Sequence, residues 1–214
     1  MNNFLTKITV ATLSFAAVAL VSAQRADAKS KSLLEAVSAN YKSNKNTYFK
    51  FIYGSGNGQV SKTQTGIFYT TPSQYRLKIM GTEQIFDGNK VYSISAEDQE
   101  VTIAKATGAE MMLSPTNYLS TYKKDFNTSY VGKKSVAGVS TDLVRLTPVK
   151  NNGIKYVNIY LNPANRQIVK IEQFGTNNDV ATILVKDYRT NQKLSPDMFT
   201  FNKNNYKNYI ITDL

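Results

Sequence analysis

Residues 75–103, YRLKIMGTEQIFDGNKVYSISAEDQEVTI, decide the fold, because they combine alternating side chains with tight turns. Apolar and polar residues alternate cleanly over Tyr75–Ile79, which is the pattern of a strand with one buried face. Residues 83–86 and 90–95 then flank Asp87-Gly88-Asn89, a strong hairpin signal. The stretch therefore predicts neighbouring antiparallel strands joined by short turns.

The same period of two continues on both sides of this stretch. Further strands are predicted at residues 48–53, 60–70, 101–103, 129–136, 141–148, 155–161, 167–174, 180–188 and 198–201. Regular strands with tight turns indicate a mainly β, meandering antiparallel sheet. Such a sheet could close as a barrel, pack as a sandwich, or curl around a helix and leave an opening.

Two segments break the strand pattern and predict helices. Ser32–Ser43 has apolar residues at helical spacing. Within residues 108–126, Pro115 fits the first turn of a second helix. The apolar sides of these helices consist of Leu33, Leu34, Val37 and Tyr41 in the first and of Tyr118, Leu119 and Tyr122 in the second. The economical arrangement places both helices against a concave, apolar face of the sheet.

Residues 1–28 have the features of a secretory signal. Residues 8–21 are apolar and uncharged, and small residues follow, with Ala23 and Ala28 as alternative cleavage positions. The apolar run is shorter than the ~18–20 residues of a membrane-spanning helix, which argues against an anchor. Residues 29–214 contain no linker or obvious repeat, so we predict a single domain that is exported from the cytoplasm.

The composition excludes many kinds of catalytic site. The 214 residues include no Cys and no His, which rules out a disulfide, a thiolate nucleophile, a Cys/His zinc site and a Ser-His-Asp triad. Ser120 and Lys123 match a serine acyl-enzyme pattern, but its companion motifs are missing. We therefore expect no enzyme activity and no metal or cofactor.

The chain is basic, with 26 Lys and Arg residues against 15 Asp and Glu residues and a formal net charge of +11. The Lys and Arg residues are dispersed, and together with the export signal this disfavours binding to nucleic acid. The charge can simply aid solubility. The hypothesis that we favour is steering toward anionic phospholipid or an acidic face of a protein partner.

Four motifs in a fixed order resemble a known family. They are Thr71-Pro72-Ser73-Gln74-Tyr75-Arg76-Leu77, Gln84-Ile85-Phe86-Asp87-Gly88-Asn89-Lys90-Val91-Tyr92, Leu143-Val144-Arg145-Leu146-Thr147-Pro148 and Phe199-Thr200-Phe201. Their order and spacing are similar to those of the periplasmic outer-membrane lipoprotein carriers, the LolA-like family, over essentially the whole mature chain. The ending at residues 209–214 is similar to a divergent branch of that family.

The resemblance implies both a fold and a function. The fold is an unclosed antiparallel half-barrel of about 11 strands, with helices as a lid on the concave apolar face. The implied function is that of a monomeric periplasmic carrier. It takes lipoproteins from an inner-membrane transporter, shields their acyl chains in the cavity, and passes them to an outer-membrane acceptor.

The resemblance also assigns residues to the site. By resemblance, the predicted acyl-chain-binding residues are Tyr75, Leu77 and Ile79 in the cavity and Tyr118 and Leu119 in the lid. We add Met111, Met112 and Tyr122, because they are apolar and close to the lid residues in sequence. The first helix should turn three more of these residues inward, Leu33, Leu34 and Val37. The family commonly has an Arg, which latches the lid, where this chain has Thr71, and a Trp where it has Leu77. Either Arg76 replaces this latch or the lid is looser.

A carrier must shield acyl chains and also release them. Each buried CH₂ is worth ~0.8 kcal/mol, so a chain of about fourteen would contribute on the order of 11 kcal/mol. Efficient release then requires incomplete burial or a lid that exchanges its own apolar side for lipid. The alternatives are a sensor of lipid or lipoprotein, another apolar-ligand-binding module of the same fold, or a lipid or glycan hydrolase.

Overall fold

The computed structural model describes residues 27–106 and 115–214. The described part of the N-terminal helix covers residues 27–43. The strands are β1 (Thr47–Asn57), β2 (Lys62–Thr70), β3 (Tyr75–Ile79), β4 (Thr82–Phe86), β5 (Lys90–Ser95), β6 (Glu100–Lys105), β7 (Phe126–Val136), β8 (Val139–Pro148), β9 (Ile154–Asn162), β10 (Gln167–Gly175), β11 (Asp179–Thr190) and β12 (Ile210–Asp213). The other helices are α2 (Pro115–Asp125) and a 3-10 turn, η1 (Lys203–Tyr206).

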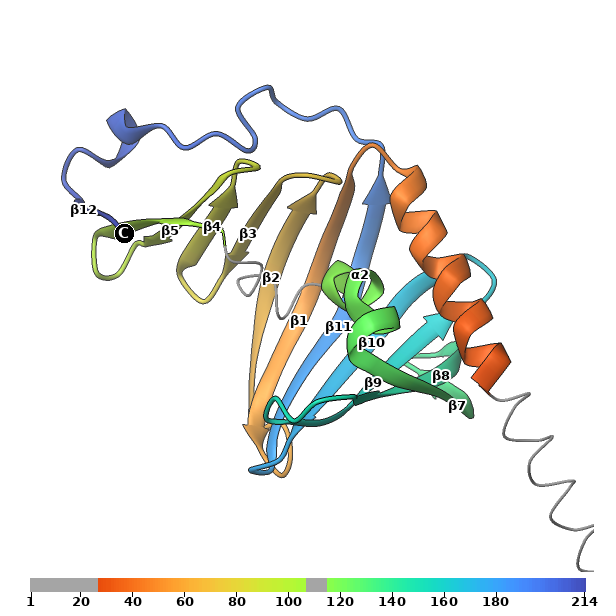
Figure 1. Cartoon of the computed structure of the whole chain (residues 1–214). Helices are drawn as coiled ribbons and strands as arrows, with labels where there is room; N and C mark the ends of the chain where they lie inside the picture. The colour runs from red at the N-terminus through yellow and green to blue at the C-terminus, as the bar shows by residue number, and fades with distance from the viewer. Residues whose placement is uncertain (1–26, 107–114) are drawn as a thin grey trace, which may run out of the picture.

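All twelve strands form one open sheet. Their order is β12-β6-β5-β4-β3-β2-β1-β11-β10-β9-β8-β7, so the sheet ends at β12 and β7. Every neighbouring pair is antiparallel except β12 and β6, which are parallel. The sheet curves beneath the two helices and does not close (Figure 1). The predicted unclosed half-barrel is therefore confirmed, with β12 as an additional parallel strand.

The strand order explains why a helix crosses one face of the sheet. β6 and β7 lie near opposite ends of the sheet. α2 is the described part of the connection between them, and β7 begins at Phe126, directly after α2 ends at Asp125. The chain must cross the sheet to reach β7, and α2 lies over the curved face on which the N-terminal helix also lies (Figure 1).

Alternation along the strands separates two apolar clusters. Tyr75 and Leu77 of β3 belong to or pack against the large cluster that contains the helix residues. Arg76, between them, faces the other way and pairs in register with Ile85, which belongs to the second cluster. We call the helix-covered face the trough and the opposite face the convex face.

The C-terminal segment, residues 191–214, covers part of the convex face. The Phe201 ring stacks on Tyr92, with 4.7 Å between centroids, and on Tyr206, with 5.2 Å. β12 then pairs with β6, beginning with Ile210 beside Glu100. This segment therefore shields both the second cluster and an edge of the sheet.

The strand predicted at residues 198–201 is wrong. Met198 donates its backbone N–H to the carbonyl of Ser195 at 3.1 Å, and Thr200 donates to the carbonyl of Asp197 at 3.0 Å. These are turn hydrogen bonds, and they keep the segment out of a strand ladder. Phe201 packs against the second cluster on the convex face. In the sequence, this apolar residue resembled part of a strand pattern.

Candidate functional site

The trough brings the predicted acyl-chain-binding residues together. All of those in the described part of the chain belong to the large cluster or pack against it. Leu34, Val37, Tyr75, Tyr118, Leu119 and Tyr122 are buried, and Leu33, Leu77 and Ile79 are partly buried. Met111 and Met112 lie outside the described residues. In this state the apolar sides of the two helices fill the trough themselves.

An aromatic floor lies beneath the helices, and the sequence analysis did not single it out. Phe49, Phe51 and Phe68 are each at most 4% exposed. Tyr41 of the N-terminal helix stacks on Phe49, with 5.7 Å between ring centroids. Residues 48–53 are apolar at nearly every position, so alternation alone did not show which side chains face the helices.

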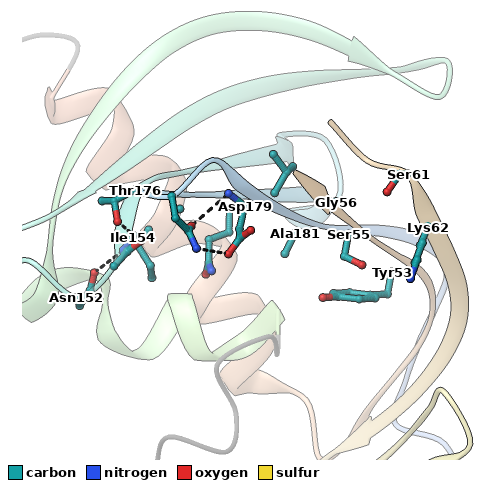
Figure 2. A pocket seen from close by; sticks show the side chains of 15 residues that line it. Tyr53, Ser55, Gly56, Ser61, Lys62, Asn152, Ile154, Thr176, Asp179 and Ala181 are labelled. Atoms are coloured by element: carbon teal, nitrogen blue, oxygen red, sulfur yellow. Dashed lines mark hydrogen bonds between the residues drawn. The ribbon is translucent and has the colours of Figure 1, made fainter. Parts of the chain in front are cut away.

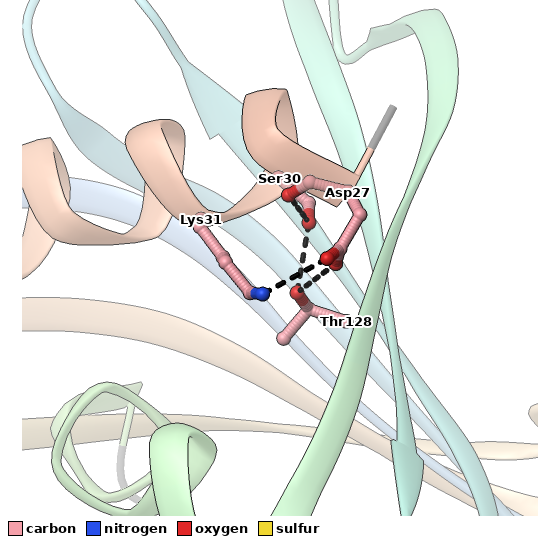
Figure 3. Close-up of polar contacts among 4 residues, drawn as sticks. All are labelled: Asp27, Ser30, Lys31 and Thr128. Atoms are coloured by element: carbon pink, nitrogen blue, oxygen red, sulfur yellow. Dashed lines mark hydrogen bonds and ion pairs between the residues drawn. The ribbon is translucent and has the colours of Figure 1, made fainter. Parts of the chain in front are cut away.

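The N-terminal helix is fixed to β7 by polar contacts (Figure 3). Ser30 is fully buried, and its hydroxyl lies 2.8 Å from that of Thr128. The same hydroxyl donates to the carbonyl of Asp27 at 2.8 Å. The Asp27 carboxylate accepts from Lys31 at 2.9 Å and from Thr128 at 3.4 Å. Ser30 is the buried member of this network, and its satisfied hydroxyl helps to hold the helix in one position.

A buried carboxylate adds a second fixed point for this helix. Asp142 of β8 is 4% exposed and accepts hydrogen bonds from Tyr130 at 2.7 Å and from Lys29 at 3.4 Å. The Lys29 ammonium lies 3.7 Å from the centre of the Tyr130 ring. The contacts with Tyr130 and Asp142 raise the pKa of Lys29. The N-terminal helix is therefore part of the rigid frame.

α2 also makes polar contacts with its surroundings. The Tyr118 hydroxyl donates to Oε1 of Gln173 on the trough side of β10, and burial raises the pKa of Tyr118. Lys123 forms an exposed ion pair with Glu35 at 2.9 Å, and exposed pairs contribute little to stability. Within the described residues, the buried hydroxyl of Tyr122 has no hydrogen-bond partner.

Of the two predicted latch residues, the structure brings Thr71 near α2 and places Arg76 on the opposite face of the sheet. The Thr71 hydroxyl accepts from the backbone of Gln74 at 2.9 Å, inside its own turn. Arg76 lies on the convex face, where it contacts Glu83 and donates to the carbonyl of Met198 at 3.0 Å. Arg76 is therefore corrected to a convex-face residue, because the residue after Tyr75 must point away from the trough.

A cavity of about 400 Å³ lies where both helices meet one end of the sheet. Thr71 and Leu119 line it together with buried Ser38, Thr47 and Thr70. Thr71 thus lies near the lid residue Leu119, and both line this cavity. The hydroxyl groups of these Ser and Thr residues line the cavity, and Leu119 belongs both to the cavity wall and to the large apolar cluster.

The Ser-x-x-Lys pattern noted in the sequence lies at the surface of α2. Lys123 of the Ser-x-x-Lys pattern is engaged by Glu35 at the surface, and Ser120 is exposed on the same helix. Residues 27–106 and 115–214 contain no group of three or more acidic, His or Cys side chains that could hold a metal ion. In the same part of the chain, no helix has the length and apolarity needed to cross a membrane.

Removing the Gln173 side-chain acceptor should loosen α2. In Gln173→Leu the Tyr118 hydroxyl loses its partner, which costs about 1 kcal/mol and raises the open population roughly fivefold. Hydrogen exchange of the amides in α2 should accelerate by the same factor, with the N-terminal helix unchanged. Gln84→Leu is the control, because Gln84 bonds to Ser93 at 3.3 Å on distant strands. Equal exchange of α2 in both variants would contradict this role of Gln173.

Comparisons with known proteins agree with this geometry. The family model described as "Outer membrane lipoprotein carrier protein LolA" matches residues 43–202. A search of curated proteins finds no match. Among solved structures, an uncharacterized conserved protein from Thermus thermophilus is similar with a TM-score of 0.61 at 10% identity, over 87% of this chain and 99% of that one. This likeness shows a shared fold.

Two further solved structures are similar at lower scores. LprF from Mycobacterium bovis has a TM-score of 0.49 at 10% identity, over 80% of this chain and 97% of that one. A LolA superfamily protein from Nitrosomonas europaea has a TM-score of 0.43 at 10% identity, with the same coverage of 80% and 97%.

Proposed function

This chain belongs to the outer membrane lipoprotein carrier (LolA) family, and on that premise we propose that it is a periplasmic carrier of lipoproteins. Members of the family are periplasmic carrier or binding proteins, and the fold suggests a module for an apolar ligand or lipoprotein. The observation that carries the proposal is the lid: the buried apolar side of α2 fills the trough, where an acyl chain would lie.

The energetics of this lid suit reversible binding. Tyr118, Leu119 and Tyr122 of α2 are buried, and at about 2 kcal/mol each their burial stabilises the closed state by on the order of 6 kcal/mol. A ligand chain that replaces them contributes on the order of 11 kcal/mol. The difference leaves a net affinity of a few kcal/mol, which permits both capture and release.

A charge in the trough should weaken binding of acylated cargo. Leu77 is partly buried and packs against the trough cluster, so Leu77→Glu would place an unpaired carboxylate beside the acyl chain. We expect the affinity for a diacylated lipopeptide to fall roughly tenfold or more. Calorimetry or displacement of a fluorescent acyl probe measures this change.

The matched control is Thr65→Glu, which places the same charge on the convex side of neighbouring β2, where Thr65 is exposed. It should bind as the wild type does, and both variants should keep the circular dichroism of a folded β protein. Equal shielding of lipopeptide by Leu77→Glu and the wild type would show that Leu77 does not face the ligand.

We also propose the route and the processing of the chain. The export signal lies within residues 1–28, the carrier domain follows the cleavage position, and cargo passes from an inner-membrane transporter to an outer-membrane acceptor. Of the two cleavage positions we favour Ala23, because cleavage after Ala28 would remove Asp27 and its bonds with Lys31 and Thr128. The basic surface would favour contact with anionic lipid or an acidic partner.

A further inference from the structure

The trough changes from apolar to polar along its strands. The trough-facing residues of β1, in order, are Phe49, Phe51, Tyr53 and Ser55. Their partners on β2 are Phe68, Gly66, Gln64 and Lys62. On β11 the partners of Tyr53, Ser55 and Asn57 are Ile183, Ala181 and Asp179. All three strands therefore become polar toward the same end of the half-barrel.

A cavity of about 670 Å³ occupies this polar end. Tyr53, Ile154, Val180 and Ala181 give it apolar walls, and Ser55, Ser61, Lys62, Asn152, Thr176 and Asp179 are among its polar lining residues. Figure 2 shows Tyr53 and Lys62 on one side of the cavity and Thr176 and Asn152 on another. Its size is within the usual range of small-molecule sites.

Three turns hold the wall of this cavity together. Gly58 donates its N–H to the carbonyl of Asn178 at 2.8 Å, which joins the β1–β2 turn to the β10–β11 turn. Thr176 donates its N–H to the carbonyl of Gly153 at 2.9 Å, which joins the β10–β11 turn to the β8–β9 turn. These hydrogen bonds therefore fix the shape of the cavity at this end of the half-barrel.

The charges of the cavity favour a polar ligand group of low net charge. Among the described residues that line it, Lys62 is the one cation and Asp179 the one anion. Within the described residues Lys62 forms no ion pair, whereas the Asp179 carboxylate accepts from Asn177 at 2.5 Å. Lys62 and the Ser55 hydroxyl can therefore donate to neutral acceptors such as ester carbonyls.

The cavity is also continuous with the lid. Gln173 lines it and accepts the hydrogen bond from Tyr118 of α2. A ligand group in the cavity can compete for Gln173, and such competition would release α2 from the trough. The polar end and the apolar trough would then be filled by two parts of one amphiphile.

We propose that this cavity binds the glyceryl ester head of an acylated ligand, with its carbonyl oxygens toward Lys62 and its acyl chains along β1 and β2 under α2. This inference rests on the proposed function, because it assumes that the trough takes acyl chains. It adds the direction in which the ligand lies. The glyceryl diester is common to a diacylated lipoprotein and to a phospholipid, so the ester chemistry alone does not distinguish these sources.

The test compares three probes on the full mature chain. They are a dipalmitoyl-glyceryl lipopeptide, the diacyl phospholipid phosphatidylcholine, and a fluorescent long-chain hydrocarbon without a polar head. Lys62→Ala should weaken binding of the ester-bearing probes roughly tenfold and leave the hydrocarbon unchanged. Lys50→Ala is the control, because Lys50 is an exposed cation on the opposite face of β1.

Each pattern of results has one meaning. If Lys62→Ala binds both ester probes more weakly, the result supports a site for glyceryl esters in general. If it binds one ester probe alone more weakly, the result supports the site and identifies lipoprotein or phospholipid as the ligand. If Lys62→Ala binds all three probes as the wild type does, the orientation is overturned and the carrier function stands. If the wild type binds none of the three, the carrier function itself fails.

Discussion

Bridging the two helices covalently should strongly slow the uptake of acylated ligands. Glu35 of the N-terminal helix and Lys123 of α2 form an exposed ion pair at 2.9 Å. The chain contains no Cys, so a bis-maleimide would react with the Glu35→Cys/Lys123→Cys variant at these two positions alone. The bridge would fix α2 to the helix that β7 and β8 hold, and the apolar side of α2 could not leave the trough. Uptake of a fluorescent acyl probe should slow roughly tenfold or more.

The controls distinguish the effect of holding the lid closed from any damage that the substitutions cause to the protein. The unbridged double variant, and the same variant capped with N-ethylmaleimide, should bind as the wild type does, because the ion pair is at the surface and contributes little. A reducible cross-linker should restore uptake once it is cut. If the bridged protein takes up the probe at the wild-type rate, α2 does not need to move away from the N-terminal helix, and the lid mechanism is wrong.

The sequence predicted the parts of this fold that local patterns determine. Asp87-Gly88-Asn89 marked the turn between β4 and β5, and Pro115 marked the start of α2. Alternation also separated Tyr75 and Leu77 from Arg76, as the structure does. These features depend on neighbours in the chain, so a single sequence contains enough information to predict them.

The features that were missed depend on distant contacts. Pairing of Ile210 with Glu100 joins segments more than a hundred residues apart, and no local pattern marks a parallel edge strand. The side chain of Arg76 was expected at the lid, although its strand position already turned it to the convex face. The hydrogen bond from Tyr118 to Gln173 could not be foreseen either, because it requires the register between β10 and the crossing helix.

Gly66 should be a position in the trough that tolerates substitution poorly. It pairs with Phe51 across β1 and β2, and the Phe51 ring lies over it. A Cβ added to Gly66 would lie 2.7 Å from Cε2 of Phe51 and closer still to Cζ. In Gly66→Val the ring must therefore move into a closely packed cluster, which costs about 3 kcal/mol. For a chain of this size the melting temperature should fall by roughly 6–12 °C.

A second substitution tests whether this collision is the cause. Phe51→Leu removes the ring from above Gly66, so Gly66→Val/Phe51→Leu should lose at least about 1 kcal/mol less than the sum of the two single variants. Thr65→Val, one residue away on the exposed convex side, controls for an added apolar side chain in β2 and should change stability little. If the double variant shows additive losses, the damage at Gly66 does not come from Phe51. The floor beneath α2 would then owe its shape to backbone conformation and not to the packing of this ring.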